Sequence, residues 1–237
     1  MARNSTFHCK QFSIEQDRCA MKVCTDAMIF GAVASIENAK RILDIGTGTG
    51  LLALMIAQRN PDASIDAIEI EAEAVLQAKE NIENSKFKHQ ISAFEVAVQN
   101  FVAAPYDVIV CNPPFYQASL LPSKLNERLA HHAESLNFVD LLNAMARLLK
   151  NEGRFNILLP NFEFEKFYEL ALKAGFFLEK NISLKNTISK PVFRNISTFG
   201  YSKTQSLESK EIIIYQEDLK TYTADFQLIM KAFYIIF

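Results

Sequence analysis

The residues best suited to chemistry follow an apolar run, at Asn112-Pro113-Pro114-Phe115. The prolines lack backbone N–H groups and have a fixed φ, so they end a strand and leave carbonyl oxygens free to accept hydrogen bonds. Asn112 adds a side-chain acceptor. Two acceptors on the N–H groups of an exocyclic base amine would return its delocalised lone pair to nitrogen, and Phe115 could stack on the base. The tetrapeptide therefore predicts chemistry on a planar amino group.

The same tetrapeptide also has an ordinary structural interpretation. Asn-Pro commonly starts a turn, and an aromatic residue after a turn often packs in a core. On its own the turn leaves both interpretations open, and a second motif upstream favours function.

The second motif is a glycine-rich turn between an apolar strand from Arg41 and a helix predicted over residues 51–59, with Asp44, Gly46, Gly48 and Gly50. Glycines let the backbone approach a ligand closely at a helix N-terminus. A nicotinamide dinucleotide would need G-x-G-x-x-G, but the third position of that fingerprint is Leu51 here. Asp44 would repel a pyrophosphate and attract the sulfonium and amino groups of S-adenosylmethionine.

The next predicted strand ends at Glu69, roughly twenty residues after the glycine turn, where such folds bind ribose hydroxyls. Alternatively, Glu69, Glu71 and Glu73 only begin a helix, whose N-terminal dipole favours negative charge. We expect Glu69 to bind a ribose because it still belongs to the strand, whereas Glu71 already supplies the negative charge at the start of the helix.

The composition is that of one compact enzyme domain. The chain has 237 residues, of which 49% are hydrophobic, and no linker or repeat interrupts it, so we expect one domain over residues 1–237. The first residues lack the apolar core of a signal peptide and no run is long enough to span a membrane, so we expect a cytoplasmic protein with no membrane partner. The four cysteines contain no C-x-x-C pair, and we expect reduced thiols and no metal site.

Strand and helix patterns alternate from Arg41 to Leu159, which predicts a doubly wound, Rossmann-like α/β sheet that is mostly parallel, and we expect a C-terminal antiparallel hairpin. The helix pattern is clearest over residues 138–150, where Asn137 is a plausible N-cap. A further helix is expected over residues 26–36. Two later strands, at residues 176–184 and 211–215, flank a polar stretch that would form a long loop or a hairpin.

The net charge of −2 excludes a generally basic nucleic-acid coat, but the cations are unevenly distributed. Between residues 179 and 210 there are two acids and six basic residues: Lys180, Lys185, Lys190, Arg194, Lys203 and Lys210. This stretch is either a modest phosphate-binding patch beside the predicted site or a solvated loop with scattered lysines.

Together these motifs resemble the class I S-adenosylmethionine-dependent methyltransferases, and the Asn112 turn resembles that of enzymes that methylate planar nitrogens. The N-terminal blocks Phe7–Phe12, Gln16–Val23 and Thr25–Asp26 and the tail Tyr222–Tyr234 are more particular. They resemble the bacterial family that methylates N6 of the adenine 3′ of the anticodon in a valine tRNA. The likeness covers essentially the whole chain.

The resemblance implies a role for each matched residue. The cofactor's methionine part would contact Asp44, Gly46, Gly48 and Gly50, and Glu69 would bind its ribose. The target base would contact Asn112, Pro113 and Phe115, with Asn112 also facing the cofactor. In an N-terminal segment over residues 1–36 that packs on the cofactor site, Thr25 and Asp26 would close over the cofactor.

One position departs from the family pattern. An acid for the adenine amino group usually follows the strand predicted at residues 91–96, and here the chain has Ala97-Val98-Gln99. We expect backbone groups at Val98, or the side chain of Gln99, to take the place of that acid.

The resemblance predicts methyl transfer by positioning, with N6 of the adenine in line with the sulfonium methyl group. No strong base is required, because the amine becomes acidic once methylated. Moving an unpaired anticodon-loop adenine onto Phe115 also costs less free energy than extruding a base from a duplex.

Two alternatives remain. A protein-glutamine methyltransferase uses the same turn on an amide nitrogen, typically with tyrosine in place of Phe115. A non-catalytic RNA-binding module would have no reason to keep Asp44, Glu69 and Asn112 together.

Overall fold

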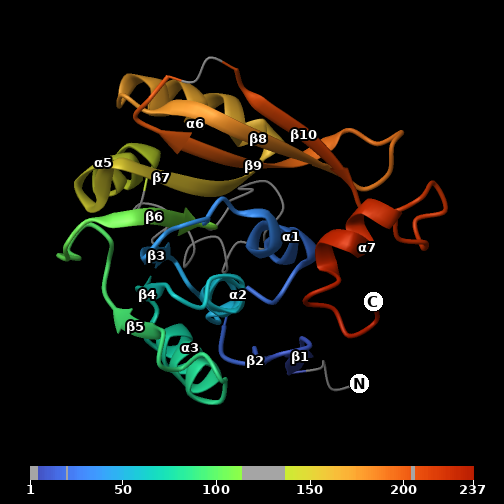
Figure 1. Ribbon diagram of the computed structural model, residues 1–237, viewed down its shortest axis with the longest axis horizontal. Coiled ribbons are helices and arrows are strands. Elements are labelled where there is room, and N and C mark those ends of the chain that lie inside the picture. The colour runs from blue at the N-terminus through green and yellow to red at the C-terminus, as the bar shows by residue number, and fades with distance from the viewer. Residues whose placement is uncertain (1–4, 20, 114–136, 204–205) are drawn as a thin grey trace, which may run out of the picture.

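The computed structural model describes residues 5–19, 21–113, 137–203 and 206–237. An eight-stranded sheet runs through the molecule in the order β10-β8-β9-β7-β6-β3-β4-β5 (Figure 1). The strands are β3 (Arg41–Ile45), β4 (Ser64–Glu69), β5 (Ile91–Glu95), β6 (Tyr106–Cys111), β7 (Leu149–Pro160), β8 (Phe177–Lys185), β9 (Val192–Gly200) and β10 (Glu208–Ile213). The helices are α1 (Thr25–Val33), α2 (Leu51–Arg59), α3 (Ala72–Glu83), α5 (Phe138–Leu148), α6 (Asn161–Lys173) and α7 (Ala224–Met230).

Every neighbouring pair in this sheet is parallel except the two that involve β9, which runs against β7 and β8. The structure therefore confirms a doubly wound, mostly parallel sheet with a C-terminal antiparallel hairpin. The polar stretch after residue 184 contributes β9 itself, where the sequence left a loop or a hairpin open.

Strand β9 carries buried polar side chains, which explains its polar sequence. Asn195 and Ser197 are at most 2% exposed. The amide Nδ2 of Asn181 donates to Oδ1 of Asn195 at 3.1 Å, and Ser197 Oγ donates to Oδ1 of Asn181 at 2.8 Å. Because these groups satisfy one another across β8 and β9, the strand is buried without an apolar pattern.

Two apolar clusters cover the two faces of the sheet. The first includes α1, α2 and α7, and the second includes α5 and α6 around the ring of Phe155. That ring stacks on Phe199 with centroids 5.1 Å apart and meets Phe176 edge-on at 4.9 Å. Among the helices of the described ranges, none has both the length and the apolar character needed to cross a membrane.

The helices that flank the central strands begin where the sequence predicts. Helix α2 spans Leu51–Arg59, and its first seven residues are all buried. Helix α5 begins at Phe138 because Oδ1 of Asn137 accepts a hydrogen bond from the Asp140 backbone N–H at 2.9 Å. Each of these helices connects two parallel strands, β3 to β4 for α2 and β6 to β7 for α5, so both N-termini lie at the carboxyl edge of the sheet.

The N-terminal segment contains a small hairpin, β1 (Thr6–His8) and β2 (Ser13–Glu15), and is held against α3. The Asn81 side chain accepts from the Glu15 backbone N–H at 2.8 Å and donates to the Glu15 carbonyl at 2.9 Å. Its Nδ2 also donates to the carbonyl of Thr49, in the glycine-rich turn, at 2.9 Å. One buried amide thus links the N-terminal segment to α3 and to that turn.

We expect Asn81→Ala to lower the free energy of unfolding by about 2–3 kcal/mol, because it removes the partners of the partly buried backbone groups of Glu15 and of the buried carbonyl of Thr49. Denaturant unfolding measures the loss. Asn84→Ala, at the exposed end of the same helix, is the matched control and should change stability much less. Equal losses in the two variants would contradict the linking role of Asn81.

Candidate functional site

The predicted site residues from the central strands lie in one row, at the carboxyl edge of the sheet. Cys111 pairs with Ile45, Ile45 with Ile68, and Glu69 with Glu95. Asn112 and Gly46 therefore follow paired residues on adjacent strands, which lie about 4.8 Å apart. This row includes the ends of β6 and β3, the two neighbouring strands at which the chain order in the sheet reverses. Ligands bind at this position in such folds.

The glycine-rich turn is built from left-handed backbone. Gly46, Gly48 and Gly50 have φ values of 72°, 54° and 83°. No atom of the described residues lies within 4 Å of where a Cβ of Gly46 or Gly48 would be, so conformation, not crowding, requires glycine at these two positions. The open space beside both residues leaves room for a ligand.

Glu69, at the end of the neighbouring strand β4, binds the backbone of this turn. Its Oε2 accepts from the Gly48 backbone N–H at 3.0 Å, and its Oε1 accepts from the Ile70 backbone N–H at 2.8 Å. The carboxylate is thereby fixed beside the turn, and Glu71 lies outside the strand as the sequence indicates.

Asp44 is fully buried beneath the turn. Its Oδ2 accepts from the Thr47 hydroxyl at 2.6 Å, while its Oδ1 has no hydrogen-bond partner among the described residues. Burial raises the pKa of this carboxyl to about 7; hydrogen bonds from the Thr47 hydroxyl and the Ala53 backbone N–H oppose the rise, and the nearby Glu69 carboxylate adds to it. Asp44 is thus a buried acceptor that a positively charged group would stabilise.

Asn112 presents a second buried acceptor. Its Oδ1 is inaccessible to solvent and has no hydrogen-bond partner in the described part of the chain. Pro113 is buried beside it. Pro114 and Phe115 lie outside the described residues, so the stacking role of Phe115 stays a prediction.

The start of α1 is tied to distant parts of the chain. The Asp26 carboxylate accepts from Arg194 Nε on β9 at 2.9 Å, and Thr25 forms a side-chain hydrogen bond with Tyr234. These contacts hold the two residues in place, and their closure over a cofactor stays a prediction.

The loop after β5 contains Val98, which is 3% exposed and packs in the cluster around α5. The guanidinium of Arg147 donates to the carbonyls of Phe101, Val98 and Gln99, at 2.6, 2.8 and 3.3 Å. Sequence reasoning missed Arg147, because a basic residue in the last turn of a helix is explained by the helix dipole alone.

Three of the six basic residues between residues 179 and 210 form ion pairs. Lys180 pairs with Glu208 at 2.8 Å and Lys185 with Glu211 at 3.0 Å, while Arg194 pairs with Asp26. These cations are therefore less available to phosphate than their clustering in the sequence suggested.

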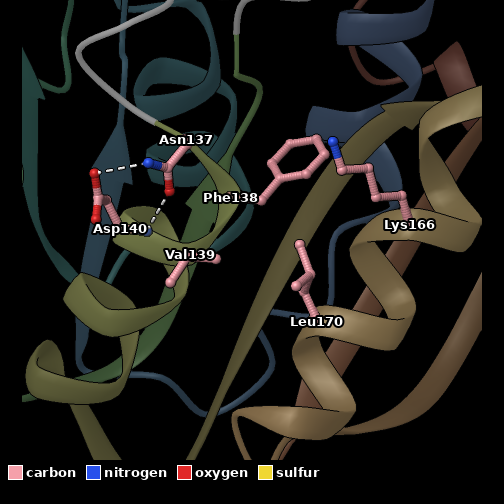
Figure 2. A pocket seen from close by; sticks show the side chains of 6 residues that line it. All are labelled: Asn137, Phe138, Val139, Asp140, Lys166 and Leu170. Carbon is pink, nitrogen blue, oxygen red and sulfur yellow. Dashed lines mark hydrogen bonds between the residues drawn. The ribbon is translucent and has the colours of Figure 1, made fainter.

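A hollow of about 320 Å³ lies between the start of α5 and the side of α6. Figure 2 shows Phe138 projecting from α5 toward α6, where Lys166 and Leu170 lie opposite. None of the predicted site residues that the structure describes is among the residues lining it. The row of strand ends therefore stays the candidate site.

Comparisons with known proteins agree with this geometry. Residues 28–162 match the model of the methyltransferase small domain family. A protein of Dyadobacter fermentans, named tRNA1(Val) (adenine(37)-N6)-methyltransferase, is 49% identical over the full length of both chains. A protein of the same name from Pseudoalteromonas translucida is 38% identical and covers 98% of this chain and 99% of its own. The chain belongs to the tRNA1(Val) (adenine(37)-N6)-methyltransferase family.

Solved structures place the fold of this family member among methyltransferases. A predicted O-methyltransferase from Agrobacterium tumefaciens superimposes with a TM-score of 0.66 at 16% identity, covering 88% of this chain and 96% of the other. A ribosomal protein L11 methylase from Lactobacillus delbrueckii gives 0.56 at 16% identity, covering 81% and 84%. At such identities the likeness concerns the fold alone.

As a member of the tRNA1(Val) (adenine(37)-N6)-methyltransferase family, the chain is a methyltransferase. Two buried oxygen acceptors lie at the carboxyl ends of the neighbouring strands β3 and β6, on Asp44 and Asn112. The Asp44 carboxylate suits a positively charged ligand, and the Asn112 amide oxygen suits a second ligand that carries N–H donors.

The raised pKa of Asp44 predicts a pH dependence of stability. The unfolded carboxyl titrates near its usual 3.8 and the folded one at about 7, so between these values the folded state binds more protons. The contribution of Asp44 to stability therefore falls as pH rises through this interval, on the order of 4 kcal/mol in total. Denaturant unfolding of wild type and Asp44→Asn at pH 5 and pH 8 measures the part of this loss that lies above pH 5, about 3 kcal/mol. A stability difference that stays constant with pH would contradict the assignment.

Proposed function

We propose that the protein transfers a methyl group from S-adenosylmethionine to N6 of the adenine at position 37 of a valine tRNA. The observation that carries this proposal is a pair of buried oxygens at the carboxyl ends of β3 and β6, Asp44 Oδ1 and Asn112 Oδ1, which have no hydrogen-bond partner among the described residues. The names of the full-length relatives support the substrate. Acting on tRNA implies work in the cytoplasm.

The residues at the strand ends suit S-adenosylmethionine. The amino group and sulfonium of its methionine part would meet the Asp44 carboxylate and the open space beside Gly46 and Gly48. Glu69, fixed by two backbone N–H groups, would accept from the ribose hydroxyls. When bound, the cofactor supplies an electrophilic methyl group.

Asn112 and Pro113 would orient the target base. The Asn112 Oδ1 and the Pro113 carbonyl would accept from the two N–H groups of N6 and turn its lone pair toward the methyl group. Because this acceptor at the end of β6 is already desolvated, little water has to be removed for it to do so. Methyl transfer would release S-adenosylhomocysteine, and the methylated amine, made acidic by methylation, would then lose its proton to water.

The experiment that tests the substrate is methyl transfer from labelled S-adenosylmethionine to total tRNA lacking modifications, followed by nucleoside analysis. We expect the label in N6-methyladenosine from one tRNA species. Label absent from RNA but present in a protein fraction would favour glutamine methylation, and binding of RNA without any transfer would favour a non-catalytic module.

Asn112→Ala should separate cofactor binding from turnover. Because the lost oxygen acts on the target amine, we expect turnover to fall by about 100-fold or more while affinity for S-adenosylmethionine changes only a few-fold. Single-turnover kinetics and calorimetry measure the two effects, with Asn84→Ala as the control for protein quality. Equal losses of binding and turnover would contradict the proposed role.

A further inference from the structure

The loop after β5 begins beside the proposed ribose ligand. Glu95, the last residue of β5, pairs with Glu69, and the Val96 backbone N–H donates to the Glu69 carbonyl at 2.8 Å. A base attached to a ribose at Glu69 would therefore lie over the residues that follow Val96.

This loop has no acid to receive an adenine amino group, since residues 97–101 are Ala-Val-Gln-Asn-Phe. It closes on itself as a tight turn, in which the Ala97 carbonyl accepts from the backbone N–H groups of Asn100 and Phe101 at 2.9 and 3.1 Å. The turn points three carbonyls, those of Val98, Gln99 and Phe101, at one guanidinium from α5.

Arg147 is suited to hold such a turn. Its planar guanidinium donates from Nη1 to Phe101 and from Nη2 to Val98 and Gln99, within 2.6–3.3 Å. Each carbonyl fixed in this way also fixes the plane of its peptide, and the N–H of a trans peptide points opposite to its carbonyl. The side chain of Val98 is buried in the cluster that also contains Leu141 and Met145 of α5, so the loop carries a buried side chain as well as the backbone contacts to Arg147.

We propose that Arg147 is a positioning residue that fixes the backbone of residues 97–101 as the adenine-binding surface of the cofactor site, in place of a side-chain acid. This inference rests on the proposed function, because it takes S-adenosylmethionine as the cofactor. Recognition of the base then depends on the orientation of peptide groups that a residue from α5 controls.

The test is calorimetric binding of S-adenosylhomocysteine and of its inosine counterpart to wild type, Arg147→Met and Arg147→Lys, together with steady-state kinetics. The inosine compound differs at the base edge that the loop would contact. We expect Arg147→Met to weaken binding of S-adenosylhomocysteine about tenfold and to reduce the preference for adenine over hypoxanthine. KM for S-adenosylmethionine should rise by a similar factor while kcat stays within about twofold.

Arg147→Lys keeps the charge but loses the planar fork, so we expect an intermediate effect. Lys150→Met is the matched control, because Lys150 lies near the same end of α5 and pairs with Asp107 at 2.6 Å, away from this loop. It should leave the base preference unchanged even where it lowers the melting temperature.

Three results would overturn the inference. A lower melting temperature in Arg147→Met with unchanged affinity and base preference would leave Arg147 a purely structural role. Loss of the base preference in Gln99→Ala, but not in Arg147→Met, would assign the base to that side chain. Failure of wild type to bind S-adenosylhomocysteine would overturn the proposed function and this inference with it, whereas the first two results leave the proposed function intact.

Discussion

The site depends on the parallel register of β6, β3, β4 and β5. Because these strands are paired residue by residue up to their carboxyl ends, the turn after each one begins at nearly the same height. A slip of one residue in β3 would turn the Asp44 side chain to the opposite face of the sheet. The register therefore sets both which side chains meet and which face they occupy, and the helices on each face serve to hold it.

The oxygens that suit the site for catalysis also burden the fold. A buried polar group without a partner costs about 1–3 kcal/mol, and among the described residues Asp44 and Asn112 each carry one such oxygen. Such groups are few in native folds, and a functional role is one explanation for them. The apolar clusters on both faces of the sheet, with the aromatic group around Phe155, offset this cost. A bound cofactor and base would satisfy both oxygens, which is why we regard them as binding groups and not as packing faults.

Local patterns predicted the parts of the structure that local physics determines. The bounds of α2, the N-cap Asn137 and the left-handed glycines follow from residue type and spacing within a few positions. The antiparallel β9 was not predicted as a strand, because its buried polar groups are satisfied by residues of β8. The Asp26–Arg194 pair joins residues far apart in the chain, so the composition of residues 179–210 could not show that three of its six cations form ion pairs, and the phosphate patch stays a prediction. Phe115 lies outside the described residues, so its place in the site is known only from the sequence pattern.

The position of β9 has a consequence for the order in which the protein is made. Strand β7 is twelve residues long, and along Arg154–Pro160 one of its edges is covered by β9, which the ribosome delivers more than thirty residues later. Until β9 emerges, the growing chain presents an apolar strand edge with unpaired backbone groups, the kind of surface that recruits other chains into aggregates. The last strands thus protect the sheet that carries the site, although none of the residues proposed to contact the cofactor or the base belongs to them.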